Sequence, residues 1–160
     1  MKKLLAVMAM LVLVSSALLA GEKSAKVDEH KFQKAEFFQG TTTGQKKAGS
    51  TVKGTLFFDN ANKQVAFLQE SGSPAITIDY SKIKAITYER SSKPRYAAAV
   101  LVSPLFLLSH SKKHYMTFQY AGENSEGKYA IVQLDKGNAR EAVACAEAQT
   151  GVKVEQVEEK

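Results

Sequence analysis

The sequence has few of the residues on which cross-links and cofactor sites depend. It contains one cysteine, Cys145, so no disulfide can form within the chain. It contains no tryptophan and only three prolines. The formal charge of +6 is a mild excess, and two of the lysines lie in the first twenty residues. This is too little positive charge to predict a nucleic-acid-binding domain, and no nucleic-acid partner is expected.

The first twenty residues have the three parts of an export signal. Lys2 and Lys3 supply the positive start, an apolar run covers 4–14, and small residues follow up to Ala20. This pattern predicts a cleavable signal peptide over residues 1–20 and a periplasmic or secreted protein, with Ala17 and Ala20 as competing cleavage sites. An uncleaved membrane anchor is the alternative. No cysteine follows the apolar run, which excludes the lipid anchor of a bacterial lipoprotein.

About 140 residues remain after the signal, which is the usual size of one domain. Residues 21–50 are polar, and we expect them to form a partly disordered lead-in. The regular pattern covers 51–152, which we predict to be the folded domain. Residues 153–160 are expected to form a frayed tail.

Alternating apolar and polar residues predict a mainly β domain. A shift of the period between Tyr80 and Ile83 predicts a bulge or corner between two strands. The turn residues 59–62 predict a hairpin between the first two strands. The expected strands cover residues 51–58, 64–68, 75–80, 83–88, 114–120 and 129–134.

A single helix is predicted at the end of the domain. Apolar residues recur at helical spacing between Ala139 and Ala146. Asn138 is the expected N-cap, with Glu141 three residues later as in a capping box. Gly151 is the expected C-cap, because glycine adopts the left-handed conformation at no steric cost.

Several short strands followed by one C-terminal helix resemble the pleckstrin-homology (PH) superfold, and the local sequence resembles its GRAM-like and bacterial PH-like branches. The segments that carry the resemblance are 54–58, 78–86, 115–118 and the closing helix up to Gly151. The resemblance covers about residues 50–152. It implies a bent, partly closed antiparallel barrel capped by the helix, and domains of this kind usually bind lipids or other proteins and are rarely enzymes. The first hairpin turn offers only Lys63, so the phosphoinositide recognition of some PH domains is not carried over.

Residues 97–108 (AAAVLVSPLFLL) form the one long apolar run after the signal, and basic residues flank it on both sides. An apolar tip surrounded by cations suits the surface of an anionic membrane. We therefore predict contact with such a surface, or with an envelope protein, through the run and its flanks. The predicted contact residues are Arg90, Lys93, Arg95, Val100, Leu101, Leu105, Phe106, Leu107, Lys112, Lys113 and His114.

Two alternatives concern the same run. Its apolar composition is also typical of a segment that fills the barrel core or covers an open edge of the sheet. As a contact surface, it could instead dock a partner protein or a second copy of the chain, which predicts an assembly or scaffold protein and a homo-oligomer.

No group of residues supports catalysis or metal binding. His110 and His114 are four residues apart, but a strand separates such positions by about 13 Å, too far to share one ion. Cys145 has no sequence partner for nucleophilic chemistry and is expected to be a half-buried, inert thiol. We therefore expect no cofactor, no metal and no enzymatic activity, although an uncharacterised enzyme stays as a third alternative.

Overall fold

The computed structural model describes residues 29–39, 50–95 and 111–158. In these ranges the chain forms eight strands, one helix and one short 3-10 turn. They are β1 (Glu29–Phe38), β2 (Thr51–Asp59), β3 (Gln64–Gln69), β4 (Pro74–Asp79), η1 (Tyr80–Lys82), β5 (Ile83–Ser91), β6 (Lys113–Ala121), β7 (Gly127–Leu134), α1 (Ala139–Thr150) and β8 (Val154–Glu158).

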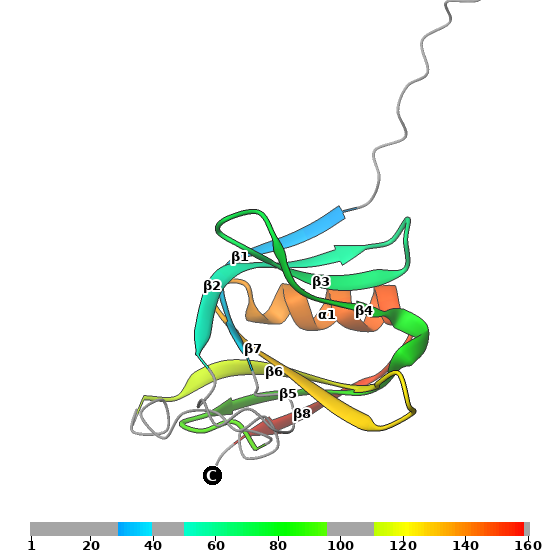
Figure 1. Ribbon diagram of the computed structural model, residues 1–160. Helices are drawn as coiled ribbons and strands as arrows, with labels where there is room; N and C mark the ends of the chain where they lie inside the picture. Colours follow the sequence, from blue (N-terminus) through cyan, green and yellow to red (C-terminus); the bar gives the residue numbers. More distant parts are fainter. Residues whose placement is uncertain (1–28, 40–49, 96–110, 159–160) are drawn as a thin grey trace, which may run out of the picture.

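The eight strands form one bent sheet in the order β4-β3-β2-β1-β7-β6-β5-β8. Neighbouring strands are antiparallel, except that β8 runs parallel to β5. β1 pairs with both β2 and β7 and so joins the two halves of the sheet, which lie on either side of α1 (Figure 1). The prediction of a mainly β fold with one helix near the C-terminus is confirmed, and the layout is that of a PH-like barrel capped by a helix.

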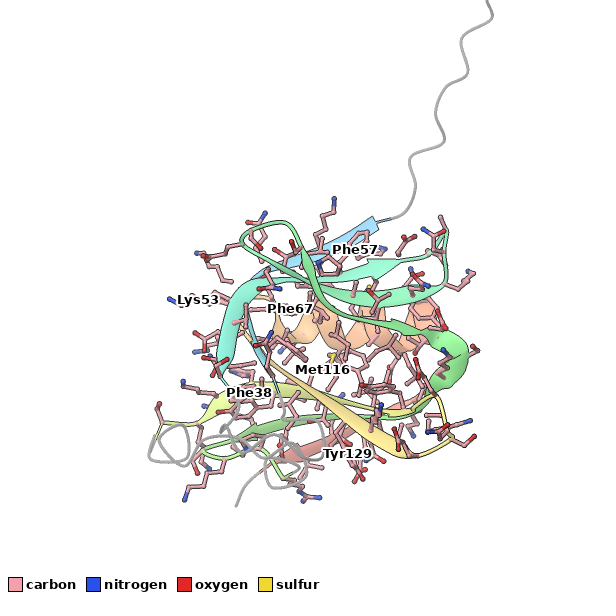
Figure 2. The ribbon with its side chains drawn as sticks, viewed as in Figure 1. Phe38, Lys53, Phe57, Phe67, Met116 and Tyr129 are labelled. Atoms are coloured by element: carbon pink, nitrogen blue, oxygen red, sulfur yellow. The ribbon has the colours of Figure 1, made fainter. Side chains whose placement is uncertain are left out.

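The main core lies between the two halves of the sheet and α1. The helix buries the apolar stripe predicted from its sequence, including Ala142 and Ala146. Aromatic rings from both halves of the sheet meet there: the Phe58 ring centroid lies 6.0 Å from that of Phe32 and 6.3 Å from that of Phe118. Figure 2 shows Met116 in the same interior. Burial of such side chains stabilises the fold by about 1.5–3 kcal/mol each.

Strand β1 corrects the predicted boundary of the domain at residue 51. Residues 29–38 belong to the sheet, and Phe32, Phe37 and Phe38 are all buried. Phe32 and Phe37 are five residues apart, an odd spacing that would place them on opposite faces of a regular strand. A β-bulge between Phe32 and Ala35, with Lys34 at φ 57°, restores them to the same face.

Strand β8 corrects the prediction of a frayed tail from residue 153. Val154 is buried in the main core, and the strand lies beside β5 with Val154 opposite Ile86. The chain therefore returns from the helix to the sheet and adds an eighth strand to it.

The connections agree with their predictions except at the helix N-terminus. The corner expected after Tyr80 is the 3-10 turn η1, and Gly151 caps α1 at φ 71° with its N–H bonded to the Glu147 carbonyl. Asn138, by contrast, makes no side-chain capping bond. Its amide donates to the Gln33 carbonyl at 2.9 Å, so this side chain ties the helix to β1.

A second, smaller cluster lies on the face of β1, β7, β6 and β5 that points away from α1, which we call the outer face. It contains Phe38, Tyr115 and Ile131, with Tyr129 packed against them. Phe38 and Tyr129 are labelled in the lower half of Figure 2. Successive side chains of a strand alternate between faces, which is why Phe37 contributes to the main core and Phe38 to this one.

Candidate functional site

The sheet brings together the two basic flanks that the sequence analysis selected. β5 ends at Ser91 and β6 begins at Lys113, and these two residues are direct partners in the ladder, as are Arg90 and His114. The strand ends that lead into and out of segment 96–110 therefore lie side by side. We call this end of the sheet the basic end, and its predicted cations are Arg90, Lys93, Arg95, Lys112 and Lys113.

Most of these cations face solvent. Arg90, Lys93, Arg95 and Lys112 are exposed, and Lys113 is half-buried. The fold adds a further cation that sequence reasoning missed. Leu134, the last residue of β7, lies opposite His114, so the turn that follows places exposed Lys136 near the basic end. The pairing of β6 with β7 creates this proximity, and the only sequence signal for it was a lysine two residues after a predicted strand.

A buried carboxylate shapes the turn after β5. Glu89 is 2% exposed, on the outer face, and its Oε1 accepts a hydrogen bond from the backbone N–H of Arg95 at 2.7 Å. Arg95 Nε lies 3.9 Å from Glu89 Oε2, and the Ser91 hydroxyl donates to the Lys93 carbonyl at 2.8 Å. The chain thus folds back after Ser91, and Arg95 lies against the side chain of Glu89.

His114 is the predicted contact residue whose role the structure changes. It is half-buried, with its ring stacked on that of Tyr88 and Nδ1 2.6 Å from the Tyr88 hydroxyl. Burial lowers the pKa of His114, and the nearby positive charges of Arg90 and Lys136 lower it further. At neutral pH the imidazole is therefore uncharged and adds no cation to the basic end.

The apolar part of the predicted contact surface, with Val100, Leu101, Leu105, Phe106 and Leu107, lies outside the described residues. The predicted signal peptide also lies outside them, as does His110, the histidine considered together with His114 as a metal ligand. Among the helices that the structure does describe, none has the length and apolar character needed to cross a membrane.

Cys145 occupies a buried position on α1. Burial raises the pKa of its thiol to about 11, with a smaller contribution from Glu141. A thiol with such a pKa is almost fully protonated at neutral pH and is a poor nucleophile, as expected of a structural cysteine. Residues 29–39, 50–95 and 111–158 contain no cluster of His, Cys, Asp and Glu that would hold a metal ion.

A hollow of about 460 Å³ lies beside the bulge of β1. Its charged lining alternates in sign, with Lys34 and Glu36 from β1, Lys53 from β2 and Glu70 after β3. Figure 2 shows Lys53 pointing away from the sheet into solvent. This mixed lining favours neither an anionic nor a cationic ligand, in contrast to the predominance of one sign at the basic end.

Comparisons with known proteins leave the family open. No protein-family model matches the sequence, and no curated protein matches it. Among solved structures, the chain is similar to one in the structure of the Spt16D–Pob3N heterodimer, with 12% sequence identity and a TM-score of 0.45. The match covers 82% of this chain and 56% of that one, so this chain spans little more than half of its length. A likeness at this level carries over no function, and the PH-like fold rests on the strand order and helix position given above.

Proposed function

We propose that the protein is an exported, non-catalytic binding domain that contacts an anionic membrane surface through the basic end and the apolar run 97–108. Cations dock first on the anionic surface, and the apolar run then enters the headgroup boundary. Within the PH-like fold we propose a GRAM-like or bacterial PH-like relative, in which binding and not catalysis is the usual role.

The gathering of cations at one end of the sheet is the observation that carries this proposal. Each lysine or arginine near an anionic surface contributes about 1 kcal/mol. The predicted cations come from both sides of segment 96–110, and Lys136 joins them from the turn after β7. Glu89 offsets part of this charge through Arg95, so we expect moderate affinity that depends on salt.

The proposal predicts that neutralising two exposed cations of the basic end weakens membrane binding. In Arg90→Gln/Lys93→Gln, the loss of two contributions of about 1 kcal/mol each should reduce vesicle partitioning roughly thirtyfold. The measurement is co-sedimentation of the purified protein with vesicles of phosphatidylglycerol and phosphatidylcholine at low salt. Added salt should weaken the binding of the unmodified protein, because ions screen exposed charges.

A matched control separates local charge from total charge. Lys84→Gln/Lys153→Gln removes the same net charge from exposed lysines at the other end of β5, because Lys84 lies near its start and Lys153 directly precedes the parallel strand β8. This variant should bind like the unmodified protein. Equal weakening in both double variants, or no binding to anionic vesicles at low salt, contradicts the proposal. Self-association without lipid would instead favour a protein partner.

A further inference from the structure

His114 lies where three elements of the basic end meet. It is the second residue of β6, directly opposite Arg90 on β5 and Leu134 at the end of β7. Residues that face each other in an antiparallel ladder have their Cβ atoms about 4.5–5.5 Å apart. Lys136 follows Leu134 in the turn before α1. The imidazole therefore lies between a strand that carries one cation and a strand that is followed by another.

The Tyr88 hydroxyl fixes one side of the His114 ring. Nδ1 lies 2.6 Å from this hydroxyl, and the two rings are stacked. A tyrosine hydroxyl can donate a hydrogen bond to a neutral imidazole or accept one from an imidazolium. The contact with Tyr88 can therefore hold the ring in the same position in both protonation states.

Nε2 of His114 is the ring nitrogen that remains for a ligand. It has no hydrogen-bond partner in the described part of the chain, and it is not one of the fully buried, unpaired side-chain atoms there. When Nδ1 accepts from Tyr88, the proton of the neutral ring is on Nε2, and the imidazolium carries a proton there as well. This N–H can donate to a phosphate oxygen, and the hydrogen bond is stronger when the ring is charged.

The cations around His114 oppose its protonation when no anion is present. Burial lowers the pKa of His114, and the positive charges of Arg90 and Lys136 lower it further. The two residues before it on β6, Lys112 and Lys113, are also cations. Like charges gathered in this way are most stable when an anion lies among them.

Asp135 acts in the opposite direction and raises the pKa of His114. Its carboxylate is engaged within its own turn, where Oδ1 accepts a hydrogen bond from the backbone N–H of Gly137 at 2.9 Å. Asp135 offsets the surrounding positive charge only in part, since the pKa of His114 stays below its ordinary value. An anionic ligand near Arg90 and Lys136 would supply further negative charge. Binding of this anion and uptake of a proton at His114 would then favour each other.

We propose that Arg90, His114 and Lys136 form a proton-dependent site for a phosphodiester group, supplied by an anionic lipid and bound by His114 as the imidazolium. This inference rests on the proposed function, because it places one headgroup at the basic end and makes membrane contact depend on pH. A phosphodiester suits the site, because its negative charge is shared by two oxygens that can accept from a guanidinium and an imidazolium together. Binding should therefore be stronger at about pH 5.5 than at about pH 7.5.

The first test compares the pH dependence of membrane binding in matched variants. The probe is vesicles of phosphatidylglycerol and phosphatidylcholine, whose phosphates keep their charge over this range of pH. From about pH 7.5 to about pH 5.5, partitioning of the unmodified protein should increase about fivefold more than that of His114→Gln, which is the effect of one added cation. His30→Gln is the control, because it also removes a histidine but lies opposite Phe58 on β2. It should behave like the unmodified protein.

The second test measures the pKa of His114 in the unmodified protein and so does not depend on the folding of a variant. The NMR shifts of the His114 ring protons are followed against pH, with and without glycerophosphoglycerol, a headgroup phosphodiester that has no acyl chains. The ligand should raise the pKa of His114, because an anion stabilises the imidazolium. Sodium chloride at the same ionic strength should raise it less, because it only screens the neighbouring cations.

The two tests separate this inference from the proposed function. If the unmodified protein and His114→Gln both bind vesicles and gain equally at low pH, the inference is wrong and the proposed function stands. If neither binds vesicles at either pH, the proposed function is wrong, and the glycerophosphoglycerol titration decides whether the same site takes a free phosphodiester. A pKa of His114 that glycerophosphoglycerol raises no more than sodium chloride does would overturn the site itself.

Discussion

His114 illustrates how one side chain takes a different role from the one its neighbours in the sequence suggest. It lies between lysines and aromatic residues, which makes it look like part of a basic rim. In the fold, its Nδ1 lies 2.6 Å from the Tyr88 hydroxyl, and its pKa is lowered by burial and by Arg90 and Lys136. The neutral form is the one that the fold stabilises.

This environment predicts a specific dependence of stability on pH. The unfolded chain binds a proton at His114 with a pKa of about 6.5. The folded protein binds it only at lower pH, so its stabilising contribution is complete above about pH 6.5 and is lost as the pH falls through the folded pKa. The free energy of unfolding should therefore decrease more steeply between about pH 7 and about pH 5 in the unmodified protein than in His114→Gln. Urea denaturation at several pH values measures this difference.

Tyr88→Phe separates the hydrogen bond from the titration. It should cost about 1 kcal/mol at neutral pH and keep the steep pH dependence, since the imidazole stays half-buried. An equal pH slope in His114→Gln and the unmodified protein would show that His114 does not titrate as its surroundings imply.

Among the strands, β2 and β3 depend on a glycine at their closest approach. A Cβ atom on Gly54 would fall against the carbonyl oxygen of Leu68 and lie 2.8 Å from the Phe67 ring. The carbonyl belongs to a strand held by its own ladder and cannot move far. We expect Gly54→Ala to lower the free energy of unfolding by about 3 kcal/mol, the upper part of the range for overpacking. Chemical denaturation measures the change.

Gly127 is the matched control, because a Cβ atom there meets nothing within 4 Å and β7 begins at this residue. Gly127→Ala should change stability by less than about 0.5 kcal/mol. Removing glycine restricts the unfolded chain and by itself favours folding, so similar losses in both variants would contradict the assignment of the effect at position 54 to the contact with Leu68.

The strands that alternate regularly are those that could be predicted from sequence. β2 to β7 and α1 keep periods of two and 3.6, and their residues were assigned correctly to within a few positions. β1 was not predicted, because the bulge at Lys34 adds a residue between Phe32 and Phe37 and so hides the alternation of apolar and polar residues. β8 was not predicted either. Its two valines, Val154 and Val157, are three residues apart and face opposite sides of a short strand, so they form no periodic pattern.

At the scale of the whole molecule, β1 holds the two halves of the barrel together. Phe37 is buried where β1 pairs with β7, and its ring centroid lies 5.4 Å from that of Phe67 on β3. Phe37→Ala should lower the free energy of unfolding by about 3–4 kcal/mol, because it opens a cavity at this junction. Urea denaturation measures the loss.

Gln33→Ala provides the comparison on the same strand. Its side chain is exposed, and only its carbonyl is used by Asn138. This variant should stay within about 0.5 kcal/mol of the unmodified protein. A small effect of Phe37→Ala would restore the view that residues before position 51 are a lead-in and not part of the domain.

Only part of the candidate site could be predicted from sequence. The flanks of residues 97–108 are adjacent in sequence to the strands they follow and precede, so Arg90 and Lys113 could be expected near each other. Lys136 joins them only through the pairing of His114 with Leu134, which no local pattern encodes. The burial of the outer face could not be predicted either, because alternation assigns each side chain to a face of the sheet but does not say which face is covered.

The central place of β1 has a consequence for how the protein is made. A chain synthesised from its N-terminus completes β1 first, yet one of its two partners, β7, ends only at Leu134. Until residues 131–133 have been synthesised, Phe37 and Phe38 lack their ladder partners on β7. Closing so long a loop is slow, so the nascent chain stays unfolded well into its synthesis. Such a delay would suit a chain that is exported before it folds, as proposed above.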